Sequence, residues 1–445
     1  MNNETEQDLA ILTERVSAAL DAARACGASD AEASASRGAG LSATVRMREV
    51  ETLEYRRDQG LAVTVYFGQR KGSASTSDLE PAAVKEAVEK ACSLARYGAE
   101  DEYAGLADPE RLARDIPDLD LYHPWALEPG LAIDVAAECE AAGLDADERI
   151  TNSEGATLST QAGSRIYGNT NGFLGGYPSS QHSLSCAVLA SADGLMERDF
   201  DYSVSRRPED LASAEEIGHE AAVRAVKRLG ARKLNTMNVP VLYPARLARS
   251  LFGHLLGAIS GGNLYRKSTF LADALGKPVF AERVQITEQP HIPRALASAP
   301  FDDEGVATAD RVLVESGVLR GYVLGSYYAR KLGMDSTGNA GGIHNLGVDS
   351  TGESFETLLA GMDKGLLVTE LMGQGVNTVT GDYSRGAAGF WIEKGEICYP
   401  VNEITVAGNL ADMYRRIEAI GTDTDLRGAV RTGSVLVGGM TVAGS

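Results

Sequence analysis

The sequence predicts an α+β fold with two domains: an N-terminal α/β domain of antiparallel strands flanked by helices over residues 1–236, and a C-terminal, mainly antiparallel β-barrel or sandwich over residues 237–445. Three observations indicate this fold. The chain has 445 residues, more than one compact domain usually holds. Its first half alternates helical periodicity with stretches of period two. Its second half has short apolar runs between glycine-rich turns, which is typical of barrels and sandwiches.

The N-terminal half contains clear local signals. Residues 5–27 carry apolar side chains at helical spacing and end at a glycine, which predicts a helix. Residues 41–78 alternate apolar and polar side chains and predict antiparallel strands, with a turn at 58–60, where the sequence reads Asp-Gln-Gly. Ser213 has Glu216 three residues later, so this capping box predicts the start of a further helix.

The C-terminal half begins with a change of pattern at 238–244, which reads NVPVLYP and marks the expected domain boundary. Pro244 is expected to open a helix that contains LFGHLLGAI at 251–259, because proline is tolerated where a helix starts. Runs such as LLVTE, GFWIE and ICYPVNEITVAG predict short strands. One late helix is expected at about 410–420.

Composition and charge narrow the class of protein. The formal net charge of -20 opposes binding to phosphate backbones, so we expect no nucleic-acid partner. No stretch approaches the roughly 20 apolar residues that span a bilayer, and the start lacks a leader pattern, so we expect a cytoplasmic protein without membrane contact. The five cysteines form no C-x-x-C pair, which favours reduced thiols.

His254 raises the question of a metal site, because it lies on the predicted helix at 251–259. A catalytic zinc needs three protein ligands and usually a nearby glutamate as base. Here the next residue is Leu255, and helical spacing puts His254 on the most apolar face of the helix. From spacing alone, His254 is therefore expected to be a core or interface histidine.

Other polar residues are candidates for binding because they lie in charged or glycine-rich segments, where a backbone can approach a ligand closely. Asp302 and Asp303 could bind a hard cation or form a charged turn. Arg266 and Lys267 could bind a carboxylate, such as a peptide terminus. The histidine in the segment GGIHN is equally consistent with a simple turn residue. The candidates are Arg266, Lys267, Asp302, Asp303, His344, Asn345, Asp382, Tyr383 and Arg385.

Long stretches of the second half resemble the TldD/PmbA metalloprotease family, and specifically its PmbA (TldE) type. They include ISGGNLYRKSTFLADALGK, PHIPRALASAPFDDEGVAT, YYARKLGMDSTGNAGGIHN and LMGQGVNTVTGDYSRGAAGFWIEKGEICYPVNEITVAGNL. The resemblance is dense over about 150–445 and looser before that. It implies an assembly of two homologous subunits, TldD-like and TldE-like, that degrades or processes unfolded peptides.

The resemblance also implies where metal would bind. In that family the TldD-like subunit carries H-E-x-x-x-H on a helix and a cysteine near its C-terminus. At the matching positions this chain has His254, then Leu255 for the glutamate and Ile259 for the second histidine, and the tail at 425–434 has no cysteine. We therefore expect no catalytic residue and no metal or other cofactor in this chain, with zinc in a TldD-like partner.

Three functions remain open from the sequence. The chain is expected to complete a peptide chamber beside the partner's zinc and to bind extended substrate by strand addition, near His344 and the segment 382–385. It could instead be a stand-alone peptide-binding or regulatory homodimer without catalysis. It could also hydrolyse peptides by itself, using His344 with Asp302 or Asp303.

Overall fold

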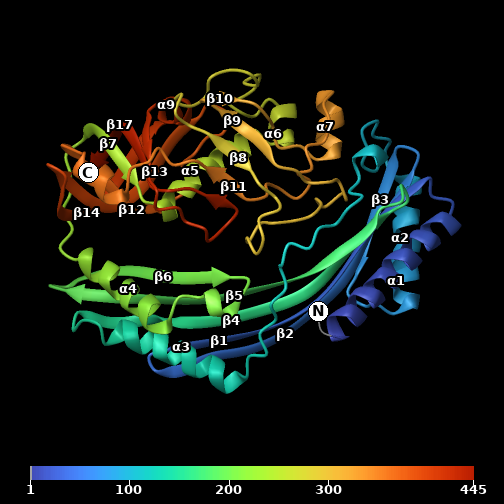
Figure 1. Cartoon of the computed structure of the whole chain (residues 1–445), viewed down its shortest axis with the longest axis horizontal. Helices are drawn as coiled ribbons and strands as arrows, with labels where there is room; N and C mark the ends of the chain where they lie inside the picture. Colours follow the sequence, from blue (N-terminus) through green and yellow to red (C-terminus); the bar gives the residue numbers. More distant parts are fainter. Residues whose placement is uncertain (1–2, 445) are drawn as a thin grey trace.

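The computed structural model describes residues 3–444 and shows a long curved sheet with a second, β-rich domain on its concave side (Figure 1). The elements of the first part are α1 (Asn3–Ala25), β1 (Asp30–Arg46), β2 (Glu49–Phe67), β3 (Arg70–Thr76), α2 (Pro81–Tyr97), α3 (Pro129–Leu144), β4 (Ile150–Asn169), β5 (Leu174–Ala192), β6 (Leu195–Ser205) and α4 (Ala214–Lys227). Six antiparallel strands follow the order β3-β2-β1-β4-β5-β6.

The helices cover the outer face of this sheet in two pairs. Helices α1 and α2 pack together at one end, and α3 and α4 pack together at the other, so the outer face has two separate apolar cores. On β1, Leu41 and Ala43 are buried in the core that contains α3. Because successive strand residues point to opposite faces, Ser42 and Thr44 face the concave side, toward the C-terminal domain.

The C-terminal domain consists of a barrel and a smaller sheet. Its elements are β7 (Met237–Tyr243), α5 (Ala245–Ala258), α6 (Gly261–Tyr265), β8 (Ile286–Glu288), β9 (Arg311–Glu315), β10 (Val318–Leu319), α7 (Ser326–Leu332), β11 (Leu346–Val348), α8 (Phe355–Ala360), β12 (Lys364–Met372), β13 (Asp382–Glu393), β14 (Glu396–Asn409), α9 (Leu410–Arg415), β15 (Ile417–Ile420), β16 (Val430–Arg431) and β17 (Val435–Gly444). The strand order β14-β13-β12-β7-β17 closes on itself, because β14 also pairs with β17. This closed barrel and the five-stranded sheet β10-β9-β8-β11-β16 share one large apolar core.

The α+β prediction is confirmed, and several local predictions agree with the structure. Helix α1 matches the segment predicted at 5–27. Both bonds of the capping box are present at the start of α4, since the Ser213 hydroxyl accepts from the Glu216 amide and the Glu216 carboxylate accepts from the Ser213 amide. Pro244 is the N-cap of α5, as expected. In residues 3–444 no helix has the length and apolar character needed to cross a bilayer.

The turn predicted at 58–60 is wrong. These residues lie inside β2, where they pair with residues 36–38 of β1. The actual turn is at Met47 and Arg48, which both have a left-handed backbone, with φ of 51° and 65°. The fully buried Glu140 carboxylate on α3 accepts hydrogen bonds from both amides, at 2.7 and 2.8 Å. A carboxylate 92 residues away thus stabilises a turn that carries no local turn residues.

The late helix is shorter than predicted. Helix α9 ends at Arg415, and the second half of the predicted segment forms β15 instead. The reason is tertiary, because Ile417 and Ile420 pair with β17 at the edge of the barrel and are buried there. Strand pairing outweighs helical periodicity in this segment.

Candidate functional site

Helix α5 is the structural element that corresponds to the metal-binding helix of the family pattern. It packs against β7, β12 and β16, and its apolar face is part of the core of the C-terminal domain. Leu255 and Ile259 both have 0% of their surface exposed. Ile259 is the C-cap of the helix, and its amide donates to the Leu255 carbonyl at 2.9 Å. The two positions that would bear a base and a second ligand are therefore filled by core side chains.

His254 lies on the partly exposed side of α5, next to two residues of β13. Its ring stands edge-on to the buried Tyr383 ring, with 6.0 Å between centroids. The His254 Nε2 atom is buried and has no hydrogen-bond partner among the described residues. Burial lowers the pKa of His254, and the positive charge of Arg385 lowers it further. Both effects favour the neutral form of the imidazole.

Arg385 and Tyr383 share one face of β13, because they are two residues apart in the strand. The Arg385 Nη2 atom donates to the Leu371 carbonyl of β12 at 3.3 Å, while its Nε atom is buried without a partner. The Tyr383 hydroxyl oxygen is also buried without a hydrogen-bond partner. It lies near the Tyr243 hydroxyl, which donates to the Met440 sulfur.

The tail segment that would supply the third ligand lies against α5. The Ser434 hydroxyl accepts from the Ala245 amide at the start of α5, at 3.0 Å, and the Arg249 guanidinium donates to the Arg427 carbonyl at 3.2 Å. Asp425 is held by Arg427 in a bidentate ion pair, with both distances near 3 Å. The tail and helix α5 therefore meet although they are far apart in the sequence. The tail offers no thiolate, and the Asp425 carboxylate is already paired with Arg427.

These residues do not fit a zinc ion. A structural or catalytic zinc needs at least three nitrogen, sulfur or oxygen ligands, whereas the α5 position has one histidine, two buried aliphatic side chains and a nearby guanidinium. Among residues 3–444 no three His, Cys, Asp or Glu side chains are grouped as a metal site would require. A cation at this position would also be repelled by Arg385.

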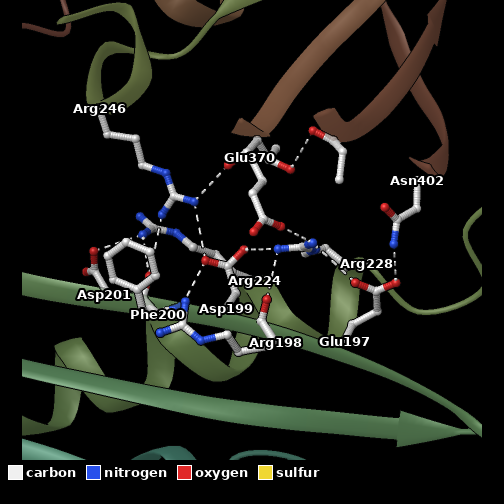
Figure 2. Close-up of polar contacts among 12 residues, drawn as sticks. Glu197, Arg198, Asp199, Phe200, Asp201, Arg224, Arg228, Arg246, Glu370 and Asn402 are labelled. Atoms are coloured by element: carbon white, nitrogen blue, oxygen red, sulfur yellow. Dashed lines mark hydrogen bonds and ion pairs between the residues drawn. The ribbon is translucent and has the colours of Figure 1, made fainter. Parts of the chain in front are cut away.

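An ionic network joins the start of α5 to the N-terminal sheet, and sequence reasoning missed it. Figure 2 shows the guanidinium of Arg228, at the end of α4, among three carboxylates. It pairs with Glu197 at 3.2 Å and Asp199 at 3.4 Å on β6, and with Glu370 on β12. Arg246 of α5 also pairs with Asp199, at 3.3 Å. The network therefore fixes the orientation of α5 relative to the curved sheet.

A pocket of about 240 Å³ lies beside this network, between the two domains. Four arginines line it, together with Asp199 and Glu370, and the remaining lining includes Leu247 of α5 and Leu371 of β12. The arginines are Arg198, Arg228, Arg246 and Arg249. The pocket is thus rich in cationic side chains, although the whole chain is strongly acidic.

A second interdomain pocket, of about 380 Å³, brings together Asp302, Asp303 and His344. Asp302 is 1% exposed, and burial raises its pKa to about 6. Its two oxygens accept backbone N–H groups of Glu304, Val306 and Ala340, each at 2.9 Å. This carboxylate organises its own loop, so it is not available as a cation ligand.

Asp303 and His344 have partners other than each other. Asp303 pairs with Arg165 of β4 at 2.8 Å, across the domain boundary. His344 Nδ1 lies 3.2 Å from the Glu288 carboxylate, which also binds Arg311 at 2.6 Å. Burial would raise the pKa of Glu288, but His344 and Arg311 lower it overall. Within residues 3–444 no hydrogen bond joins His344 to either aspartate, so the proposed catalytic pair is not formed.

The remaining candidate residues are scattered or structural. Asn345 is fully buried and donates to the Gln289 carbonyl at 2.9 Å and to the Ser298 hydroxyl at 2.7 Å. Arg266 and Lys267 are exposed after α6, and Arg266 donates to Asn263 at 3.1 Å. Asp382 is exposed and accepts a 2.6 Å hydrogen bond from Thr380.

The concave face of the curved sheet carries rows of hydroxyl groups that sequence reasoning did not identify. The registers align Ser42 with Ser159 and Ser183, and Thr44 with Thr157 and Ser185. The Ser42 and Ser159 hydroxyls are 2.8 Å apart, and those of Thr44 and Thr157 are 2.9 Å apart. All six side chains are partly exposed. These six side chains are polar and uncharged, so they offer hydrogen bonds, and Glu54 of β2 continues the first row beside Ser42.

A helix-backed curved sheet that faces a closed barrel is the architecture of this chain, and the comparisons with known proteins place it in a class of metallopeptidases. Three domain profiles of that class match this chain: PmbA/TldA metallopeptidase domain 1 over residues 31–95, the central domain over 122–229 and the C-terminal domain over 236–444. The chain belongs to the PmbA/TldD metallopeptidase family.

Individual relatives agree with this assignment. Metalloprotease PmbA of Escherichia coli O157:H7 is 50% identical over 443 residues, which cover 99% of this chain and 98% of that protein. A crystal structure from Bacteroides thetaiotaomicron, described as a candidate modulator of DNA gyrase, has a TM-score of 0.93 at 29% identity and covers 97% of this chain and 98% of that one. A metalloprotease TldD homolog of Buchnera aphidicola is 25% identical over 272 residues, 55% of each chain. The relatives thus include both PmbA-like and TldD-like proteins.

Proposed function

We propose that this chain is the metal-free, TldE-type subunit of a cytoplasmic TldD/TldE peptidase that degrades or processes unfolded peptides. A TldD-like subunit would supply the zinc and the catalytic base. This chain would complete the peptide chamber and hold the substrate in an extended form. The proposal goes beyond family membership, because it assigns the two roles to different subunits.

The single observation that carries the proposal is the state of helix α5. The family resemblance matches this helix with the metal-binding helix of TldD-like chains, yet Leu255 and Ile259 are completely buried in the core. Burial of such side chains stabilises the fold by roughly 1.5–3 kcal/mol each. Packing of this kind supports the proposal that hydrolysis comes from another chain.

The hydroxyl rows of the concave face support the proposed handling of peptides. Extended peptides bind mainly through backbone hydrogen bonds, which do not depend on sequence. The partly exposed rows of serine and threonine on β1, β4 and β5 face the C-terminal domain and carry no charge. Such rows suit peptides of varied composition, as expected for a degradation or processing chamber.

Reconstitution with a TldD-like subunit that carries H-E-x-x-x-H tests this proposal. We expect the mixture to form a heteromer by light scattering and to hydrolyse a casein-derived unfolded peptide at least tenfold faster than either subunit alone. Asp303→Ala should lower that activity only modestly, and His344→Ala should not abolish it, because neither side chain performs the chemistry. Peptide hydrolysis by this chain alone, lost in His344→Ala, would contradict the proposal. A homodimer that does not bind the TldD-like subunit would favour the alternative function, a stand-alone peptide-binding or regulatory protein.

A further inference from the structure

The strongest unexplained feature of the molecule is a cluster of unpartnered polar atoms around His254. Six buried side-chain nitrogen or oxygen atoms in the described part of the chain lack a hydrogen-bond partner. Three of these six atoms are His254 Nε2, the Tyr383 hydroxyl oxygen and Arg385 Nε. The His254 and Tyr383 rings lie edge-on with 6.0 Å between centroids, and Arg385 follows on the same face of β13, near enough for its charge to lower the pKa of His254. Buried polar groups are normally paired, because an unpaired one costs about 1–3 kcal/mol. Such a concentration at one place indicates a ligand site.

The chemistry of the three groups identifies the class of ligand. An arginine Nε–H can only donate, and a tyrosine hydroxyl can donate. A neutral imidazole adds either one donor or one acceptor. Arg385 forms no ion pair within residues 3–444, so its charge is uncompensated by the protein. Donors around an uncompensated positive charge suit an anion, and a planar carboxylate fits the guanidinium best.

The side of helix α5 that carries His254 is partly exposed, although the three polar atoms themselves are buried. Leu247, Ser250, His254 and Gly257 follow one another at helical spacing and are all partly exposed, while the other face of the helix is buried. A side chain added at Gly257 would meet nothing within 4 Å, so there is open space beside the helix. At its other end this line reaches the arginine-rich interdomain pocket, which Leu247 and Leu371 line. The Leu371 carbonyl is also the acceptor for Arg385.

We infer that the region around His254 is a carboxylate-binding site, in which Arg385, Tyr383 and His254 hold a carboxylate of an extended peptide. The inference rests on the proposed peptide-binding role and adds the group that is recognised. The cation that zinc would provide in a TldD-like subunit is replaced here by a guanidinium fixed on β13. The carboxylate can come from the peptide C-terminus or from an acidic side chain.

Titration calorimetry with three eight-residue peptides tests this inference on the purified full chain. One peptide has uncharged side chains and a free C-terminus, the second is its C-terminal amide, and the third is the amide with one internal glutamate. A charge-assisted hydrogen bond contributes about 1.5–3 kcal/mol, which equals a roughly 10- to 150-fold change in Kd. We therefore expect at least one carboxylate peptide to bind at least tenfold more tightly than the uncharged amide, and the better one identifies the source.

Variants at the proposed site test whether it causes the preference for carboxylate peptides. Arg385→Ala should reduce the affinity of the carboxylate peptides to that of the uncharged amide, whereas Arg415→Ala, at an exposed arginine of the same domain, should leave the preference for a carboxylate unchanged. Tyr383→Phe keeps the buried ring and should weaken only the carboxylate peptides, by about threefold or more, and it serves if Arg385→Ala fails to fold. Equal affinity for all three peptides, no binding to any, or a preference that survives both variants would overturn the inference. None of these results depends on peptidase activity of the reconstituted pair.

Discussion

Replacing Arg228 with alanine is expected to lower the free energy of unfolding by about 3–5 kcal/mol, because it leaves buried carboxylates without their shared cation. Arg228 is 8% exposed and contacts Glu197, Asp199 and Glu370, which come from both domains. Its Nη1 atom also donates to the Arg198 carbonyl at 2.8 Å. Arg246 would still pair with Asp199, but no other arginine reaches all three carboxylates in the part of the chain that the structure describes.

Urea unfolding, followed by circular dichroism, measures this effect. The matched control is Arg198→Ala, since Arg198 is 44% exposed and its ion pair with Glu154 lies at the surface. An exposed pair contributes about 0–1 kcal/mol, so the control should stay within that range. We also expect faster proteolysis between the domains in Arg228→Ala, because the network orders α5 against β6. A loss below 1 kcal/mol would show that the Arg228 network contributes little to holding the two domains together.

Leu255→Glu is expected to unfold the C-terminal domain or to cost at least about 4 kcal/mol, although it restores the glutamate of the family's metal motif. The Leu255 side chain is completely buried in the main core. The substitution removes its packing, which usually costs 2–5 kcal/mol, and places an unpaired carboxylate in an apolar environment.

Two control variants test whether the loss of stability comes from burying a charge or from any substitution at position 255. Leu255→Met keeps the volume and should cost less than about 1.5 kcal/mol. Leu275→Glu introduces the same charge at a leucine of the same domain that is 41% exposed, and should change stability by no more than about 0.5 kcal/mol. A well-folded Leu255→Glu variant with an unchanged midpoint of unfolding would contradict the interpretation that α5 is now a packing helix.

Local sequence rules predicted the elements whose stability is local. The capping box at Ser213 and the helix that follows Pro244 depend on residues within four positions of each other, and both are present. The Met47–Arg48 turn depends on Glu140 of α3, so no nearby residue indicates it. The Asp58–Gly60 segment has turn residues but lies within a long strand pair, where the ladder decides its conformation.

The candidate site also contains some features that local sequence predicts and others that depend on residues far apart in the sequence. Burial of Leu255 and Ile259 follows from helical periodicity and agrees with the structure. Asp302 and Asp303 are neighbours in sequence yet have opposite roles, since Asp302 accepts three backbone amides while Asp303 faces Arg165 of the other domain. The Arg228 network and the hydroxyl rows join residues that are distant in sequence. Periodicity describes each segment alone, so these contacts could not be predicted from it.

Zinc content per chain tests the central claim most directly. The purified protein would be loaded with zinc, desalted and analysed by mass spectrometry, with a TldD-like subunit that carries H-E-x-x-x-H treated in parallel. We expect less than 0.1 zinc ion in this chain and about one in the TldD-like subunit, because His254 is the one possible ligand that remains on α5. One zinc ion per chain, abolished by His254→Ala, would contradict the assignment of this chain as the metal-free subunit.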